Sequence, residues 1–310
     1  MPLTVSRAGL LKSRLSRFTR VLPDLEKGDV RSLHRARVAS RRLRELVPVL
    51  QVDADAARKL GRRLRKITAR LGRVRELDVL LGLIDELRAS QPVHQDALRR
   101  VGAAVAKSRD AARKRLPDDL SGELYRLARK LERLLRDLKQ SDKSQSDKSP
   151  SHGRAVRWAI EARVARRAAR LLAAIEDAGG VYLPERLHGV RISLKKLRYA
   201  VELLEAVEST RGTRRSPVVG ALKREQDVLG RMHDLQVLID RVRAVQALLA
   251  PPDPAVWHQL DALVVSLDES CRRLHGRYIH DRQTLSAIAS RLAVVSARQN
   301  VPARGVRRAG

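Results

Sequence analysis

The 310-residue sequence has very little of several things on which folds and sites depend. Its one cysteine, Cys271, excludes an internal disulfide framework and a zinc site built from cysteines. No apolar run approaches the roughly 20 residues that would span a bilayer. Basic residues also interrupt the first 18 residues, which therefore lack the apolar core of a signal peptide. These absences predict a soluble, cytoplasmic protein.

Aromatic residues are also scarce, at 2%, and glycine and proline are few. This composition argues against a β-sandwich or β-barrel, whose strands favour aromatic and β-branched residues. Hydrophobic residues make up 43% of the chain, which excludes a disordered basic tail without a core. The sequence therefore predicts an all-α fold built from Leu, Ala, Val and Arg, with a length that corresponds to about two domains.

What the sequence has in excess is positive charge. Its 65 Lys and Arg residues against 35 Asp and Glu residues give a formal net charge of +30. A compact body with this charge repels itself unless a partner neutralises it, and the candidates are nucleic acid, an anionic membrane or another phosphate polymer. Proteins that bind single strands usually offer aromatic rings to the bases. The scarcity of rings here predicts a ligand bound through its charge.

Apolar residues recur at helical spacing almost throughout the chain. They predict helices near residues 3–22, 31–51, 54–89, 94–116, 118–139, 154–178, 184–209, 216–249 and 255–296. The polar, repetitive stretch at 140–153 is typical of a flexible linker. It divides the chain into an N-terminal helical subdomain at 1–139 and a C-terminal one at 154–298, followed by a loose basic tail at 299–310.

Two segments of the first half recur in the second half in the same order. LHRARVASRRLR at 33–44 aligns without a gap with LHGVRISLKKLR at 187–198. LGRVRELDVLL at 71–81 likewise aligns with LGRMHDLQVLI at 229–239. Two matched pairs in one order indicate a duplicated helical unit rather than chance similarity between Arg-rich helices.

On a helix, the first motif places one histidine and three basic residues in a narrow stripe opposite the apolar residues. We call these the His-led stripes, and they consist of His34, Arg37, Arg41 and Arg44, and of His188, Arg191, Lys195 and Arg198. A solvated helix face is the plain alternative. However, like charges stacked at i, i+4 destabilise a helix, so a duplicated stripe is better explained by a ligand. The guanidinium of Arg donates two parallel hydrogen bonds to phosphate oxygens, and Lys acts as a point charge. A mixture of the two suits a repeating phosphate chain.

Further basic residues flank or continue the stripes. Arg42 and Lys196 lie beside them, and the second helix of each half adds Arg62, Arg65, Lys66 and Arg73, and then Lys223, Arg224 and Arg231. The acidic residues Glu76 and Asp234 occupy equivalent positions, where we expect them either to hold basic side chains in place or to cap structure. A polyanion beside His34 and His188 would raise the pKa of both side chains.

Neither metal binding nor catalysis finds support in the sequence. No carboxylate or second histidine follows His34 or His188 at i+3 or i+4 to complete a metal site. The sequence also lacks a Gly-rich phosphate loop, a nucleophile with a base partner and a carboxylate cluster for magnesium. It therefore predicts a protein that is not an enzyme and needs no metal or other cofactor.

The first half contains the motif His-x-x-Arg-x-x-x-Arg-Arg-Leu-Arg, the second half contains its Lys-Lys counterpart, and Leu-Gly-x-x-Arg/His-Glu/Asp-Leu follows each of them. This double motif resembles that of the CHAD family, which is named for a conserved histidine α-helical domain. The resemblance covers roughly residues 5–295. It implies two four-helix-bundle subdomains related by pseudo-two-fold symmetry, with a basic groove between them. It also implies binding of inorganic polyphosphate and targeting to polyphosphate granules.

The resemblance assigns the binding residues to both stripes and their flanks: His34, Arg37, Arg41, Arg42, Arg44, His188, Arg191, Lys195, Lys196 and Arg198, followed by the second-helix basic residues. Some relatives carry a triphosphate-hydrolysing tunnel domain, whose acidic, lysine-lined strand pattern is absent here. The sequence therefore predicts non-enzymatic binding of polyphosphate, without a membrane partner. The alternatives are a sequence-nonspecific nucleic-acid-binding protein and an adaptor protein recruited to a polyanion.

Overall fold

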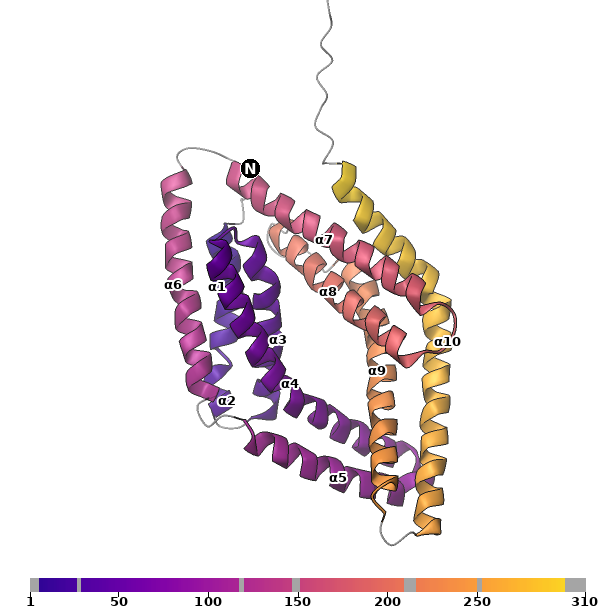
Figure 1. The fold of residues 1–310 in the computed structure, drawn as a ribbon. Coiled ribbons are helices and arrows are strands. Elements are labelled where there is room, and N and C mark those ends of the chain that lie inside the picture. Colours follow the sequence, from indigo (N-terminus) through magenta and orange to yellow (C-terminus); the bar gives the residue numbers. More distant parts are fainter. Residues whose placement is uncertain are drawn as a thin grey trace, which may run out of the picture. The chain divides into compact units, whose positions relative to one another are not determined.

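The computed structural model describes residues 6–26, 29–116, 120–146, 151–208, 216–249 and 253–298, and every regular element in these ranges is a helix (Figure 1). The α-helices are α1 (Arg7–Thr19), α2 (Leu22–Glu26), α3 (Val30–Leu46), α4 (Ala54–Ser90), α5 (Gln95–Lys114), α6 (Leu120–Ser146), α7 (Ser151–Ala178), α8 (Pro184–Glu208), α9 (Pro217–Gln246) and α10 (Pro254–Arg298). Short 3-10 helices occupy Val47–Val49 and Pro92–His94. The all-α prediction is confirmed.

Helix starts follow from capping side chains and from proline. The Asp29 carboxylate accepts the backbone N–H of Ser32 at 2.7 Å, and Asp53 accepts that of Ala56 at 2.7 Å. These bonds satisfy amide groups that have no partner in the first turn. Proline is the first residue of three helices, because its missing N–H costs nothing there: Pro184, Pro217 and Pro254.

Two of the predicted helices end earlier in the structure than the apolar periodicity suggests. The helix predicted near 31–51 ends at Leu46 and gives way to a 3-10 turn that contains Pro48. Proline removes a backbone donor and clashes with the preceding turn, so the α-helix stops there. The helix predicted near 3–22 is likewise divided into α1 and α2.

Most of the segment that was predicted to be a flexible linker, residues 140–153, is helical in the structure. Residues 140–146 continue α6 and residues 151–153 begin α7, while 147–150 lie outside the described residues. Arg7 of α1 donates to Asp142 at 2.9 Å and to Ser141 at 3.2 Å, and the Arg7 side chain is only 8% exposed. Polar composition misleads here because a residue of a neighbouring helix binds the side chains of Ser141 and Asp142. The predicted tail at 299–310 lies outside the described residues.

The chain forms two compact units, and neither is a continuous half of the sequence. The N-terminal unit comprises Val5–Pro150 and Arg231–Leu274, and the C-terminal unit comprises Ser151–Gly230 and the chain from His275. The division differs from the predicted one because α9 and α10 are long and each contributes to both units. The four-helix composition of each subdomain and their pseudo-symmetry stay predictions.

In the N-terminal unit, α3 lies against α1 and α4, α1 packs on α6, and α4 packs on α5 (Figure 1). The core residues come from all these helices and include Leu11, Phe18, Leu43, Leu64 and Leu131, each fully buried. Burial of each such side chain stabilises the fold by about 1.5–3 kcal/mol relative to exposure. The unit therefore holds α3 and α4 firmly against one another.

In the C-terminal unit, α7 and α8 lie side by side (Figure 1). Their buried residues recur at three- and four-residue spacing: Val156, Ile160, Val164, Ala168, Leu171 and Ile175 on α7, and Leu187, Val190, Leu194, Leu197 and Val201 on α8. This spacing lines up one apolar face on each helix. Within the described ranges, no helix combines the length and apolar character that crossing a bilayer requires.

Candidate functional site

The first His-led stripe lies on α3, on the side that the core leaves open. Leu33, Ala36 and Leu43 are buried, whereas His34 is exposed and Arg37 and Arg41 are half-buried. The neighbouring candidates Arg42 and Arg44 are also half-buried. The predicted division of this helix into an apolar face and a cationic face is confirmed by burial.

A buried polar contact fixes how α3 meets α4. The hydroxyls of Ser40 on α3 and Thr68 on α4 are hydrogen-bonded at 2.9 Å. Both residues are buried, and Thr68 also donates to the Leu64 carbonyl at 2.6 Å. A buried hydroxyl pair is costly to separate, so it holds the register of the two helices.

This register places the second motif beside the first. Gly72 of α4 lies next to the Arg37 side chain, and a Cβ atom added at Gly72 would be 3.5 Å from Arg37 Nε. Arg75, in the same motif, is close enough to His34 for its charge to act on the imidazole. Sequence reasoning did not include Arg75 among the site residues, although its equivalence with His233 was the available signal.

Burial and neighbouring cations both act on the two stripe histidines. Desolvation by the surrounding protein, followed by the charges of Arg75, Arg37 and Arg41, lowers the pKa of His34 below its usual value of 6.5. Desolvation, followed by the charges of Arg191 and Lys195, lowers the pKa of His188 in the same way. Cations destabilise the charged imidazole, so a bound polyanion would act in the opposite direction.

The second His-led stripe, on α8, repeats the pattern in the C-terminal unit. Leu187, Val190 and Leu194 are buried, while His188, Arg191 and Lys195 are half-buried. Lys196, beside the stripe, is half-buried too. The two stripes therefore share their residue pattern and their half-buried basic residues, each within its own unit, although His34 is exposed and His188 is half-buried.

Arg198, the last member of the second stripe, is engaged inside its unit. It donates to Gln226 of α9 at 2.9 Å and to Glu202 at 2.6 Å, and its side chain is 12% exposed. Its guanidinium also lies 4.8 Å from the centre of the Tyr199 ring. A positive charge balanced by a carboxylate and bound to a neighbouring helix holds α8 against α9. The structure thus gives Arg198 a positioning contact that its place in the stripe did not indicate.

The second-helix basic residues of the second half lie next to carboxylates. Arg231 forms two hydrogen bonds with Glu86 in the N-terminal unit, at 2.9 and 2.7 Å. Lys223 lies 3.5 Å from Asp227. Arg224 is exposed and acts on the neighbouring Glu225 carboxyl. These contacts reduce the positive charge that the second half can offer to an anion.

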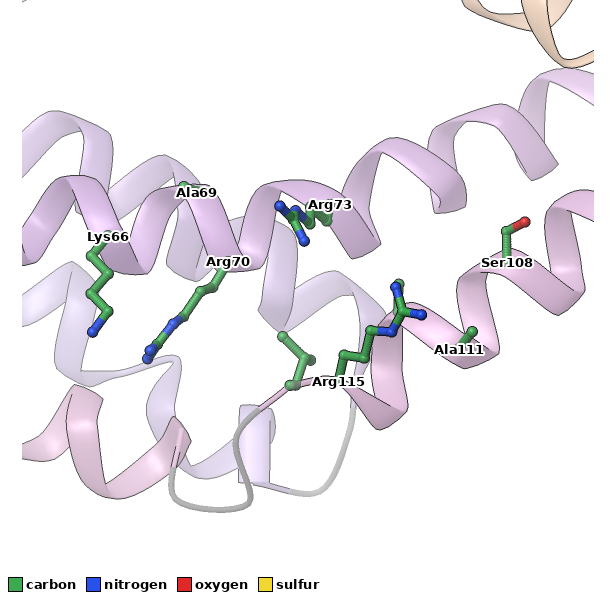
Figure 2. Close-up of a pocket in the computed structure, with 9 residues that line it drawn as sticks. Lys66, Ala69, Arg70, Arg73, Ser108, Ala111 and Arg115 are labelled. Atoms are coloured by element: carbon green, nitrogen blue, oxygen red, sulfur yellow. The ribbon is translucent and has the colours of Figure 1, made fainter.

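The second-helix basic residues of the first half are all exposed on α4. Lys66 and Arg73 line a cavity of about 630 Å³ between α4 and α5 (Figure 2). Arg62 lines another cavity, of about 560 Å³, between α4 and α6. Arg65 lines neither of these two cavities. The structure therefore does not join all four residues to the stripe on α3.

Among the described residues, no group of three or more His, Cys, Asp and Glu side chains is arranged to hold a metal ion. Glu76, for which the sequence suggested an orienting role, is exposed on α4. The chemistry that the described site offers is that of guanidinium, ammonium and imidazole groups, which can donate hydrogen bonds to an anion.

Fold and site together define a class, that of all-α proteins with a duplicated basic helix face. The family model of the CHAD domain matches residues 9–243, well over half of the chain. The chain therefore belongs to the CHAD domain family, as its motifs indicated, and this family is associated with inorganic polyphosphate.

Solved structures agree with this family. PptA from Streptomyces chartreusis is 18% identical, with a TM-score of 0.57 over 96% of this chain and 100% of its own. The CHAD domain from the plant Ricinus communis is 21% identical, with a TM-score of 0.51 over 97% of this chain and 93% of its own. At these identities the likeness shows a common fold. Among curated proteins, no match is found.

Proposed function

We propose that this protein binds inorganic polyphosphate without chemical change, through the two His-led stripes. One observation carries the proposal: two helices from separate parts of the chain present the same His-x-x-Arg-x-x-x-Arg/Lys row on their open sides. Both histidines lie among cations, whose charges add to the effect of burial in lowering the pKa of each. A family associated with polyphosphate supports the choice of ligand.

The chemistry of the stripes suits a chain of phosphate groups. The Arg37 and Arg191 guanidinium groups can each donate two parallel hydrogen bonds to phosphate oxygens, and Lys195 adds a point charge. A polymer engages successive cations at high effective concentration, so modest single contacts add up to tight binding. Binding of this kind needs no fixed register along the chain.

The histidines add a contact that depends on protonation. When a polyanion binds beside His34 or His188, it stabilises the doubly protonated imidazole, which then donates from both ring nitrogens. Binding is thereby coupled to the uptake of protons, so the free energy of binding depends on pH. His34 and His188 serve here as binding residues, with no role in bond breaking.

We also propose that the protein is cytoplasmic and associates with polyphosphate granules. Polyphosphate at a granule surface presents many chains at once, which favours a multivalent cationic binder. Fluorescence microscopy of the tagged protein would test this. We expect foci that coincide with stained granules and that disperse when the cells cannot make polyphosphate. Foci that persist in such cells would contradict granule association.

The direct test of the function is a titration of the purified protein with long-chain polyphosphate at physiological salt. We expect submicromolar binding and no hydrolysis of the polymer. Duplex DNA, single-stranded DNA and a sulfated polysaccharide, added at equal charge, are the competitors. We expect each to displace polyphosphate poorly. Equal displacement by DNA would favour a nucleic-acid-binding protein, and equal displacement by the sulfated polymer would show binding to any polyanion.

A further inference from the structure

The side of α4 that faces away from α3 carries positive charge of its own. Thr68 marks the side that faces α3, because it is buried and hydrogen-bonded to Ser40. Lys66 and Arg70 are each two residues away from Thr68, which at about 100° per residue turns them about 160° around the helix. The stripe on α3 and these cations therefore lie on opposite sides of α4.

This face of α4 lines two cavities in succession, both inside the N-terminal unit. The cavity of about 560 Å³ lies towards the start of α4, and α6 closes its other side with Lys130 and Arg133. The cavity of about 630 Å³ follows along α4, and its other side is closed by Ser108 of α5 and by Arg115, directly after the end of α5. Figure 2 shows Lys66, Arg70 and Arg115 around the second cavity.

Cations follow one another along this face at helical spacing. Lys59, Arg63, Lys66, Arg70 and Arg73 recur every three or four residues and all line one cavity or the other. At 1.5 Å per residue they extend over about 21 Å. We call this row the α4 track. Its length fits a chain of phosphates better than a single phosphate ion.

Acidic side chains offset only part of the charge on the α4 track. Glu123 of α6 pairs with Arg70, Asp55 pairs with Lys59 at 2.6 Å, and Asp137 of α6 lines the first cavity. Lys66 and Arg73, by contrast, form no ion pair with a carboxylate among the described residues, and both are exposed. Cations at i, i+3 and i+4 along one helix repel one another. A ligand that neutralises them would remove this repulsion.

The remaining lining residues point to the ligand class. Ala69, Ala111, Ala112 and Leu116 form the apolar part of the second cavity, and the small side chains of the three alanines leave room for a ligand. No aromatic residue lines either cavity, so neither offers a ring on which a base could stack. Ser108 adds a neutral hydroxyl, which can donate to a phosphate oxygen.

We propose that the α4 track is a second binding site for condensed phosphate, separate from the His-led stripes. This proposal takes only the class of ligand from the proposed function. A second track on the other side of α4 lets one molecule hold a further stretch of polymer, or a second chain. The protein then links phosphate chains instead of merely coating one.

The test compares three sets of alanine substitutions with short polyphosphate of uniform length as the probe. The stripe variant carries Arg37→Ala, Arg41→Ala, Arg191→Ala and Lys195→Ala. The track variant carries Arg63→Ala, Lys66→Ala and Arg73→Ala, and a matched control carries Arg88→Ala, Arg100→Ala and Arg129→Ala, three exposed residues outside both cavities. Alanine favours the helix and none of these residues is fully buried, so the changes preserve the fold.

Calorimetry is run on the stripe variant alone, and with the track or control changes added. We expect the stripe variant to retain binding, the track changes to weaken it by at least about tenfold, and the control changes to alter it by less than about twofold. Hydrogen exchange should show protection by the probe in peptides covering 59–73 and 108–116.

Three results would overturn the second site. The first is that the stripe variant binds no probe, a result that leaves the proposed function intact. The second is that the control changes weaken binding as much as the track changes do. The third is that single-stranded DNA displaces the probe as well as polyphosphate does at the same phosphate concentration. A stripe variant that binds as tightly as the parent, and loses that binding with the track changes, contradicts the proposed function and supports the α4 track.

Discussion

Histidine protonation is the single-residue property that most directly links this site to its ligand. In the free protein, the pKa of His34 and of His188 is lowered from 6.5 by desolvation and by neighbouring cations. A polyanion raises both, so binding is accompanied by proton uptake. We predict that polyphosphate affinity rises as the pH falls from above 7 through the ordinary histidine range, when measured at constant ionic strength.

The double variant His34→Gln, His188→Gln is the comparison for this pH dependence. We expect its affinity to change much less over the same pH interval, because glutamine does not titrate. His94→Gln, outside both stripes, is the control and should behave like the parent. An unchanged pH profile in the double variant would show that other groups take up the protons.

Gly72 is the residue whose missing side chain leaves space for Arg37. A leucine there would extend beyond the Cβ position, which is already 3.5 Å from Arg37 Nε, and would displace the guanidinium. We predict that Gly72→Leu weakens polyphosphate binding by about tenfold in a titration. Gly82→Leu on the same helix is the control, since nothing lies within 4 Å of its Cβ position. Equal affinities of the two variants would show that the position of Arg37 is unimportant.

Sequence reasoning identified most of the stripe residues because period and residue type decide which face a side chain joins. His34, Arg37 and Arg41 lie on the open side of α3 as predicted. It could not foresee that Arg198 is engaged by Glu202 and Gln226, because a periodic pattern does not show which partner a neighbouring helix supplies. For the same reason it missed Arg75 beside His34.

Among the helices, the contact between α1 and the end of α6 depends on one ion pair. Asp142 accepts two hydrogen bonds from the Arg7 side chain, at 2.9 and 3.1 Å, in a place where Arg7 is nearly buried. Removing one partner leaves the other charge unpaired. We predict that Asp142→Ala lowers the free energy of unfolding by about 2–3 kcal/mol in urea denaturation.

Lys139→Ala, an exposed change one turn earlier in α6, is the control for this prediction and should cost less than about 0.5 kcal/mol. If Asp142→Ala cost no more than the control, residues 140–146 would have no part in the packing of the unit. The polar composition of that segment would then have described it correctly as a linker.

In the C-terminal unit, the buried carboxyl of Glu225 on α9 interacts with the half-buried carboxyl of Asp281 on α10. Burial, followed by the charge and hydrogen bond of Asp281, raises the pKa of Glu225 to about 7, against the opposing charges of Arg224 and Arg277. The folded protein therefore keeps a proton that the unfolded chain loses near pH 4.5. Stability from this group is complete below pH 4.5 and falls as the pH rises to about 7.

We predict that Glu225→Gln removes this loss and stabilises the protein at pH 8 by up to about 3 kcal/mol, with little effect near pH 4. Urea denaturation at the two pH values measures the difference. Glu176→Gln, at an exposed position of α7, is the matched control and should change stability little at either pH. Equal behaviour of the two variants would mean that Glu225 is ionised in the folded protein.

Helix positions were largely predictable because the apolar spacing of α4, α7 and α8 is regular enough to identify them. Their ends depend on finer chemistry, such as Pro48 after α3. The continuation of α6 to Ser146 was not predictable from composition, since the partner that holds Asp142 is Arg7, far away in the sequence.

For the whole molecule, the duplicated motifs indicated the family, and the net charge of +30 supports the proposed class of ligand. The division into two units could not be predicted from periodicity. Apolar spacing tells which face of α9 or α10 is buried but not which helices cover it, and each of these two helices contributes to both units. The same limit hid the α4 track, whose cavities depend on how α5 and α6 lie against α4.

The most direct test of the central claim is a titration with long-chain polyphosphate at several salt concentrations. It measures the affinity of the stripe variant, which carries Arg37→Ala, Arg41→Ala, Arg191→Ala and Lys195→Ala. The control removes four exposed cations elsewhere, two from each unit: Arg88, Arg100, Arg170 and Arg291. We predict at least about a hundredfold loss of affinity in the stripe variant, and a log–log salt slope that falls by about one for each lost phosphate contact. An affinity and slope that match those of the control would contradict the account.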